Sequence, residues 1–229
     1  MAIVQQPKRK PKLTLKKSKE ICGTISTSNK KLNCPSWSLS PTECITGSKL
    51  AKNPKSVCSK CYADRMQKFR SNIEVSWNRN HTKYMVSKIT PESKKEWTNS
   101  MIHLIDDSCK KMNVNYFRWF VGGDIPDTEF IERAFEIANR MQHINFWLPT
   151  KEYSLIKNID LDLIPDNLTI RVSNPMINPK STHSLHPNTS TSFTKDAPIK
   201  LGSVCKEYCE PCNYKCWKKD IKNITYIMH

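Results

Sequence analysis

The chain has 229 residues, of which 38% are hydrophobic, and this is enough for one folded domain with a real core. Its 37 Lys and Arg residues outnumber 21 Asp and Glu residues and give a formal net charge of +16. The charge favours a polyanionic partner, with nucleic acid ahead of a membrane surface; a lysine-rich composition that only keeps the protein soluble is the alternative.

Residues 1–20 are a basic N-terminal tail. They hold seven Lys and Arg residues but only one acid, Glu20, and this charge density predicts disorder. The apolar run before Gln5 is too short for a secretory signal or a membrane span. We therefore expect a cytoplasmic protein with no membrane partner, in a compartment where thiols stay reduced.

Residues 21–61 are rich in cysteine and show no sustained hydrophobic period. Such a segment cannot fold on a hydrophobic core alone, and thiolate ligation is a candidate for what holds it. In a reducing compartment, cysteines are more often ligands than disulfides. The segment therefore predicts metal or cluster ligation by Cys34, Cys44, Cys58 and Cys61.

Helical spacing follows this segment. Apolar residues predict one or two helices between residues 62 and 88, stopped by Pro91, and a further helix over residues 94–112. Cys109 lies beside the apolar stripe of that further helix. We predict that Cys109 is a small core residue rather than a ligand.

Residues 114–173 alternate between strand and helix. Strands are predicted over 114–121, 144–149 and 168–173, with a helix over 128–141 capped by Asp127 and a short helix over 152–158. Short connections between such elements are typical of right-handed βαβ units. The sequence predicts an α/β fold, a partial (β/α) barrel of three or four parallel strands, in a single domain over residues 21–229.

Each predicted strand ends in polar residues, namely Gly122-Gly123-Asp124, Thr150-Lys151 and Ser173-Asn174. Ligands bind outside the carboxyl ends of parallel strands, so this pattern predicts a site that contains Asp124 and Lys151. Paired glycines would let the backbone approach a ligand closely. A simple turn with a helix cap is the alternative interpretation of Gly-Gly-Asp.

The C-terminal segment 203–217 has the highest density of cysteine. Cys205, Cys209, Cys212 and Cys216 follow the spacing Cx3Cx2Cx3C, and short spacers let four thiolates converge on one centre. The same family of spacings occurs in ferredoxin-type cluster ligation, and zinc is the alternative. We predict that segments 21–61 and 203–217 bind metal and flank the barrel.

Five short stretches carry a resemblance to a known family. "CPSWSLSPTEC", "CSKCYADR", "RWFVGGDIP", "FWLPTKEY" and "CEPCNYKCW" are similar to the phage gene product 88 family, over about residues 30–218. More distantly, the chain resembles radical S-adenosylmethionine enzymes. That likeness rests on a cysteine pair followed by Tyr-Ala, a strand that ends in Gly-Gly-acid and a strand that ends in Thr-Lys.

The more distant resemblance implies cofactors and site residues. It implies a [4Fe–4S] cluster on Cys44, Cys58 and Cys61, and contact of Gly122, Gly123 and Asp124 with the methionine amino group of S-adenosylmethionine. A second cluster would then be auxiliary.

Two functional hypotheses stand at this point. One is a radical enzyme that acts on or beside nucleic acid in the host cytoplasm, with Asp124 and Lys151 positioning the cosubstrate or substrate. The other is a non-catalytic module that binds nucleic acid or protein and is held together by zinc or by closed iron–sulfur clusters.

Overall fold

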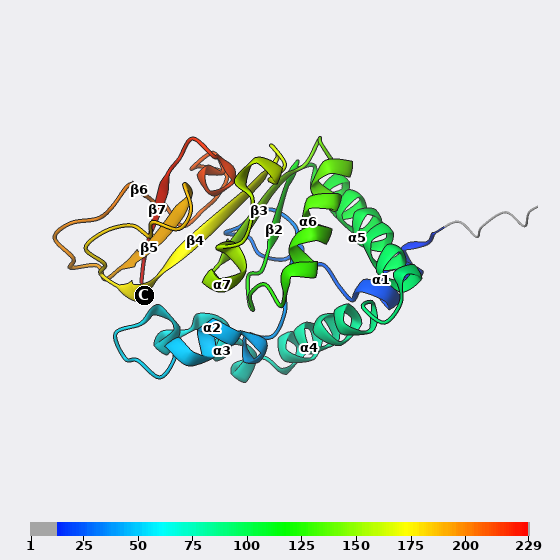
Figure 1. Ribbon diagram of the computed structural model, residues 1–229, viewed down its shortest axis with the longest axis horizontal. Coiled ribbons are helices and arrows are strands. Elements are labelled where there is room, and N and C mark those ends of the chain that lie inside the picture. Colours follow the sequence, from blue (N-terminus) through cyan, green and yellow to red (C-terminus); the bar gives the residue numbers. More distant parts are fainter. Residues whose placement is uncertain (1–12, 229) are drawn as a thin grey trace, which may run out of the picture.

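A computed structural model describes residues 13–228, which form an open parallel sheet with helices around it (Figure 1). In this part of the chain the sheet has seven strands in the order β1-β2-β3-β4-β5-β7-β6, and every pairing is parallel. The strands are β1 (Ser36–Trp37), β2 (Tyr116–Trp119), β3 (Asn145–Thr150), β4 (Leu168–Ile177), β5 (Thr189–Phe193), β6 (Ser203–Val204) and β7 (Asn223–Ile227). The predicted α/β class with parallel strands is confirmed.

The predicted number of three or four strands is wrong, because β1, β5, β6 and β7 come from segments without an apolar strand pattern. β5 has the sequence TSTSF, and its hydroxyls are satisfied within the sheet. The Thr191 and Thr225 Oγ1 atoms lie 2.9 Å apart, and the Asn223 side-chain amide donates to Thr191 Oγ1 at 3.0 Å. Polar cross-strand pairs can stabilise a sheet without apolar alternation.

Helices of different lengths surround the sheet. They are α1 (Leu15–Cys22), α2 (Ile45–Leu50), α3 (Tyr62–Phe69), α4 (Ser71–Val86), α5 (Pro91–Met112), α6 (Thr128–Arg140) and α7 (Tyr153–Ile156). Pro91 begins α5 behind a capping box of Thr90 and Ser93. Cys109 is 3% exposed in the core, as predicted. Among residues 13–228, no helix has the length and apolar character needed to cross a membrane.

Helix α1 includes residues 15–20, which the sequence assigned to a disordered tail. Ser18 is fully buried, and its Oγ lies 3.0 Å from His103 Nδ1 of α5. Lys16, Lys17 and Lys19 remain exposed. The prediction of disorder is wrong for this part of the tail, because α1 packs against α5 while its lysines stay in solvent. Residues 1–12 lie outside the described part of the chain.

An aromatic cluster fixes β1 at the edge of the sheet. The Trp37 ring meets the rings of Trp97 and Trp119 edge to face at 5.7 and 6.0 Å, and it stacks on Phe130 at 5.9 Å. These rings come from β1, α5, β2 and α6, so the cluster joins four elements. Asp127 caps α6 as predicted, since its carboxylate accepts the Phe130 backbone N–H at 2.9 Å. The loop that carries Cys44, Cys58 and Cys61 follows β1, so the position of β1 fixes the start of that loop.

Candidate functional site

The loop that follows β1 brings three cysteines to the carboxyl edge of the sheet. Cys44 precedes α2, Cys58 lies in the short 3-10 turn η2 (Val57–Lys60), and Cys61 precedes α3. Gly47 of α2 faces two of them: its Cβ, if present, would stand 3.7 Å from the Cys44 Sγ and 3.8 Å from the Cys58 Sγ. Cys61 is close enough for its charge to raise the pKa of both. We call these three residues the carboxyl-edge thiols.

The extension of β4 holds the loop between Cys44 and Cys58. Ser56 is fully buried, its hydroxyl donates to Leu50 O at 2.6 Å, and the Ile177 N–H donates to Lys55 O at 3.0 Å. β4 continues to Ile177, so Ser173-Asn174 lies inside this strand rather than after it. That predicted strand end is therefore wrong, and the additional residues of β4 anchor the thiol loop.

Asp124 and Lys151 meet at the same edge, as the two strand ends predict. Asp124 Oδ2 accepts the backbone N–H of Lys151 at 2.8 Å, and Asp124 Oδ1 accepts the backbone N–H of Ile125 at 2.8 Å. Asp124 thereby ties the loop after β2 to the loop after β3. It is not the cap of α6, because Asp127 has that role. The predicted contact of Asp124 and Lys151 with a ligand stays a prediction.

Glu152 is a residue of this site that the sequence pattern did not identify. It is 1% exposed, and its carboxylate accepts the Thr46 backbone N–H at 3.0 Å and the Thr46 hydroxyl at 2.6 Å. Thr46 lies two residues after Cys44, so Glu152 fixes the thiol loop to the end of β3. The sequence did contain a signal for Glu152, because an acidic residue directly after Thr150-Lys151 lies at a predicted strand end.

The electrostatics of the site favour a cationic ligand. Burial raises the pKa of Cys44 and Cys58, and the carboxylates of Asp124 and Glu152 raise both further. Lys151 opposes the rise at Cys58. Burial also raises the pKa of Asp124 to about 6, against the hydrogen bonds that it accepts. Thiols and carboxylates in one buried place can ionise together only when positive charge compensates them.

The paired glycines have a packing role. A Cβ on Gly122 would stand 2.5 Å from ring carbons of Trp77. Gly123 has φ +78°, and a Cβ there would stand 2.7 Å from Leu39 O. Both positions therefore require glycine because β1 and α4 pack tightly against this turn. Their predicted contact with a methionine amino group stays a prediction.

Cys34 lies with the C-terminal cysteines and apart from the carboxyl-edge thiols. It belongs to one buried cluster with Cys209, Tyr214 and Cys216. The Cys209 N–H donates to Lys31 O at 2.9 Å, and the Tyr214 hydroxyl donates to Asn33 O at 3.2 Å. The sequence grouped Cys34 with Cys44 because the two are neighbours in the chain, but Cys34 precedes β1 and Cys44 follows it. The strand separates them.

The guanidinium of Arg118 marks the centre of this second group. Burial raises the pKa of four thiols, and the charge of Arg118 partly offsets the rise in each of them: Cys34, Cys205, Cys209 and Cys216. The charge of Cys212 raises the pKa of Cys205 and Cys209. Cys34 and the four C-terminal cysteines thus form one set, which we call the five-thiol set. In Figure 1 the orange-red coil that precedes β7 lies at the top of the view, away from α2 and α3.

The thiols have the donor type that zinc and iron–sulfur clusters both use. Within residues 13–228, no three Cys, His, Asp or Glu side chains stand close enough to ligate one metal ion. The ligands of an iron–sulfur cluster attach to separate irons of a cage, so they need not converge on one point. The missing Cβ of Gly47 leaves space against two of the carboxyl-edge sulfurs. The donor type suits a thiolate-bound centre at this edge, and the predicted cluster stays a prediction.

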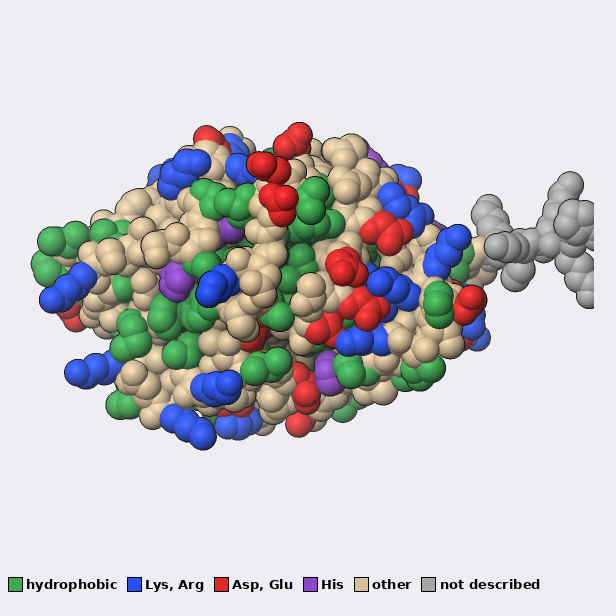
Figure 2. Space-filling model, viewed as in Figure 1, with side chains coloured by type: hydrophobic (Ala, Val, Ile, Leu, Met, Phe, Trp, Pro, Cys, Tyr) green, Lys and Arg blue, Asp and Glu red, His purple; other side chains and the backbone are tan. Residues whose placement is uncertain are grey.

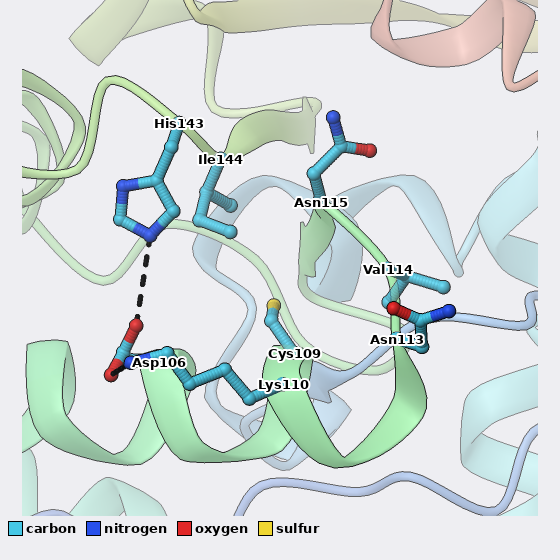
Figure 3. Close-up of a pocket in the computed structure, with 8 residues that line it drawn as sticks. All are labelled: Asp106, Cys109, Lys110, Asn113, Val114, Asn115, His143 and Ile144. Atoms are coloured by element: carbon cyan, nitrogen blue, oxygen red, sulfur yellow. Dashed lines mark hydrogen bonds and ion pairs between the residues drawn. The ribbon is translucent and has the colours of Figure 1, made fainter.

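Two surface hollows differ in their relation to the thiols. One, of about 350 Å³, adjoins Cys44 and includes Lys49 and Lys52 in its lining. The other, of about 360 Å³, lies before β2 and β3, where His143 Nε2 stands 3.6 Å from Asp106 Oδ1 (Figure 3). None of the predicted site residues lines the second hollow. The hollow beside Cys44 adjoins the site through that one thiol.

Comparison with known protein families shows to which family the chain belongs. A family model described as Gene product 88 matches residues 4–218, which is most of the chain. The chain belongs to the gene product 88 family. The resemblance expected from the five short stretches is confirmed, and a bacteriophage family is established with it. Comparisons of this gene product 88 protein with curated proteins and with solved structures found no match.

Proposed function

We propose that this gene product 88 protein is an iron–sulfur enzyme of the radical S-adenosylmethionine type, with a [4Fe–4S] cluster on Cys44, Cys58 and Cys61. The observation that carries the proposal is the separation of Cys34 from these three cysteines. A cubane cluster has four irons, so three thiolates leave one iron for a ligand that is not protein. With Cys34 as a fourth ligand, that iron would be closed.

When bound, such a cluster supplies the electron that cleaves the sulfonium of S-adenosylmethionine. The chain supplies a binding place for that cationic cosubstrate. Asp124 and Glu152 are held beside the thiols, and both raise the pKa of Cys44. Asp124 accepts hydrogen bonds from the backbone N–H groups of Ile125 and Lys151 and from the Thr150 side chain, and a carboxylate has about four lone-pair sites, so one remains for an ammonium group. Lys151 stands beside Cys58 and is the candidate for orienting an anionic group of the cosubstrate or substrate.

The five-thiol set supports a second, structural centre, with zinc or a closed cluster as its metal. Tyr214 and Trp217 of segment 203–217 pack in a buried cluster, and ligation would add folding free energy to that packing. The alternative function is a non-catalytic module that binds nucleic acid or protein, in which both thiol groups hold zinc or closed clusters. This alternative rests on the five-thiol set and does not need an open iron.

Nucleic acid is the substrate class that the charge favours. The formal charge of +16 falls to about +12 when two thiolate-bound centres, each of net charge about −2, are counted, and the protein stays basic. A polyanion is attracted to such a chain over long range. Thiolate-bound iron also requires a reducing compartment, which for a phage protein is the host cytoplasm.

Iron, zinc and sulfide analysis of the full-length protein, purified without oxygen, tests the proposal. We expect iron and inorganic sulfide in the wild type. Cys58→Ala should remove the cluster at the carboxyl edge and leave the five-thiol centre occupied, whereas Cys212→Ala should do the reverse. Cys22→Ala is the matched control, because Cys22 is fully buried and no other thiol contributes to its pKa. Colourless protein with zinc and no sulfide would instead favour the non-catalytic module.

A further inference from the structure

The segment that carries the carboxyl-edge thiols also carries a dense positive charge. Residues 44–70 contain seven Lys and Arg residues and one acid, Asp64. Figure 2 shows Lys and Arg side chains along the lower edge of the molecule, where Figure 1 places α2 and α3. We call the seven the basic rim, and all are exposed: Lys49, Lys52, Lys55, Lys60, Arg65, Lys68 and Arg70.

Helix α3 adds two exposed aromatic rings to the basic rim. Phe69 is 86% exposed and Tyr62 is 47% exposed. Residues seven apart lie on the same face of a helix, and Arg65 lies between the two rings on that face. The Tyr62 hydroxyl donates to Val121 O, which holds this ring at the end of β2. α3 thus presents a row of ring, guanidinium and ring beside the site.

The hollow beside Cys44 lies on the same segment as the basic rim, and its lining includes one acid, Glu43. Thr42, Lys49 and Lys52 are among the residues that line it. Thr42 belongs to the short turn η1 (Pro41–Glu43), and the Ser40 hydroxyl before that turn donates to Gln67 Oε1 of α3 at 2.9 Å. This hydrogen bond holds the turn that lines the hollow against α3.

We propose that the basic rim and the α3 rings bind single-stranded nucleic acid and lead it to the carboxyl-edge thiols. Lysine and arginine contact phosphates, and exposed rings stack on bases whatever their sequence. A duplex keeps its base faces inside its own stack, so only a single strand can use Phe69 and Tyr62. An acidic protein partner could pair with the lysines and arginines of the basic rim, but it has no bases to stack on Tyr62 and Phe69. The inference rests on the proposed function, because it makes a nucleic acid strand the substrate of that site.

Fluorescence anisotropy with a labelled 20-nucleotide oligo-dT and a duplex of the same length tests the inference on the full-length protein. The single strand should bind more tightly than the duplex at the same salt. Phe69→Ala should weaken single-strand binding about fivefold or more, because stacking on one base is lost. Ile89→Ala is the matched control, since Ile89 is 75% exposed and lies away from α3. It should leave binding unchanged.

Charge variants test the basic rim separately from the rings. The double variant Lys49→Gln, Lys52→Gln should lower the slope of log affinity against log salt by about 1.4, since each phosphate contact of a single strand adds about 0.7. Lys110→Gln, Lys111→Gln removes two exposed lysines of α5 and is the matched control. All these variants keep the same N-terminal tail, so its charge cancels from each comparison.

Several outcomes would overturn the inference. Binding to oligo-dT could be absent at low salt, or the duplex could bind more tightly than the single strand. Phe69→Ala and Ile89→Ala could also change the affinity for oligo-dT equally, or the two lysine pairs could change its salt slope equally. Metal analysis separates this failure from failure of the proposed function. Protein that contains iron and sulfide but does not bind oligo-dT would contradict the nucleic-acid substrate and support the cluster. Protein that binds oligo-dT through the basic rim but contains no iron would support the nucleic-acid surface and contradict the proposed iron–sulfur enzyme.

Discussion

Arg171 and Cys216 are joined by a hydrogen bond inside the protein: the Arg171 Nε donates to Cys216 O at 2.8 Å, and the Arg171 side chain is fully buried. The same guanidinium donates to Lys218 O at 2.7 Å and to Ile221 O at 2.8 Å. A single side chain of β4 therefore holds the C-terminal cysteine segment, and this anchor does not depend on bound metal.

Removal of this anchor should strongly destabilise the protein. Arg171→Met leaves several buried carbonyls without donors, and hydrogen bonds to a charged group contribute about 1.5 to 3 kcal/mol each. We expect a loss of at least 3 kcal/mol of unfolding free energy in denaturant titration, roughly two such bonds. Arg140→Met is the control: Arg140 is exposed and pairs with Glu136, so its loss should cost less than about 1 kcal/mol. Equal costs for the two variants would contradict the role of Arg171.

Cys34 should behave as a member of the five-thiol set. Cys34→Ala should lower bound metal by the same amount as Cys212→Ala, and the double variant should lose no more than either single variant. Two residues that act through one centre are non-additive. Metal and sulfide content per chain is the measurement, with Cys22→Ala as the control. Additive losses in the double variant would place Cys34 and Cys212 in different centres.

The alternating part of the chain was predictable from sequence, and the cysteine grouping was not. Residues 114–173 alternate apolar runs with helical spacing, and β2, α6 and β3 follow from that pattern. Cys34 and Cys44 are ten positions apart in the same loop-like segment, yet β1 sends them to different edges of the sheet. A two-residue strand gives no periodic signal.

Glu152 shows a second limit of sequence reasoning. Its partner, Thr46, lies 106 positions away in the chain, so the contact depends on the folded sheet. Arg171 was hidden for the same reason, since a charged residue within the strand LTIRVS has no local partner. Asp124 and Lys151 were found because the ends of parallel strands are placed together by the fold class itself.

A substitution at Gly47 should affect metal binding and leave folding nearly unchanged. Gly47→Ala would place a Cβ 3.0 Å from the Cys44 Cβ and within 3.8 Å of the sulfurs of Cys44 and Cys58. The variant should hold less iron and sulfide at the carboxyl edge. The stability of its metal-free form should change by less than about 1 kcal/mol, because the better helix propensity of Ala inside α2 is offset by the tight contact with the Cys44 Cβ. Full cluster content in Gly47→Ala would show that this space is not used.

Asp124 and Asp127 should respond to pH in opposite ways in the metal-free protein. Burial raises the Asp124 pKa from 3.8 to about 6, so the folded protein holds this proton more tightly than the unfolded chain. Unfolding free energy should therefore fall as pH rises from about 4 to about 6.5. Relative to Asp124→Asn, the wild type should lose up to about 3 kcal/mol over that window.

Asp127 provides the comparison for this measurement. Burial alone would raise its pKa, but hydrogen bonds from Lys88, Tyr84 and the Phe130 backbone outweigh burial and lower it. A lowered pKa adds stability that is present above the unfolded value and lost as pH falls. The cost of Asp127→Asn should thus be largest at neutral pH and shrink in acid. The same pH trend for both variants in denaturant titrations would contradict the assignment.

The last prediction concerns the ligand of Asp124. If its carboxylate contacts the amino group of S-adenosylmethionine, Asp124→Asn removes a charge-assisted hydrogen bond, which is worth about 1.5 to 3 kcal/mol, or roughly ten- to a hundredfold in affinity. Calorimetric titration of S-adenosylmethionine into cluster-replete wild type, Asp124→Asn and Asp127→Asn measures this difference. Asp127→Asn should bind as the wild type does, because Asp127 caps α6 and faces Tyr84 and Lys88. No binding to the wild type, or equal binding to all three proteins, would remove Asp124 from the proposed contact and leave the non-catalytic module as the better hypothesis.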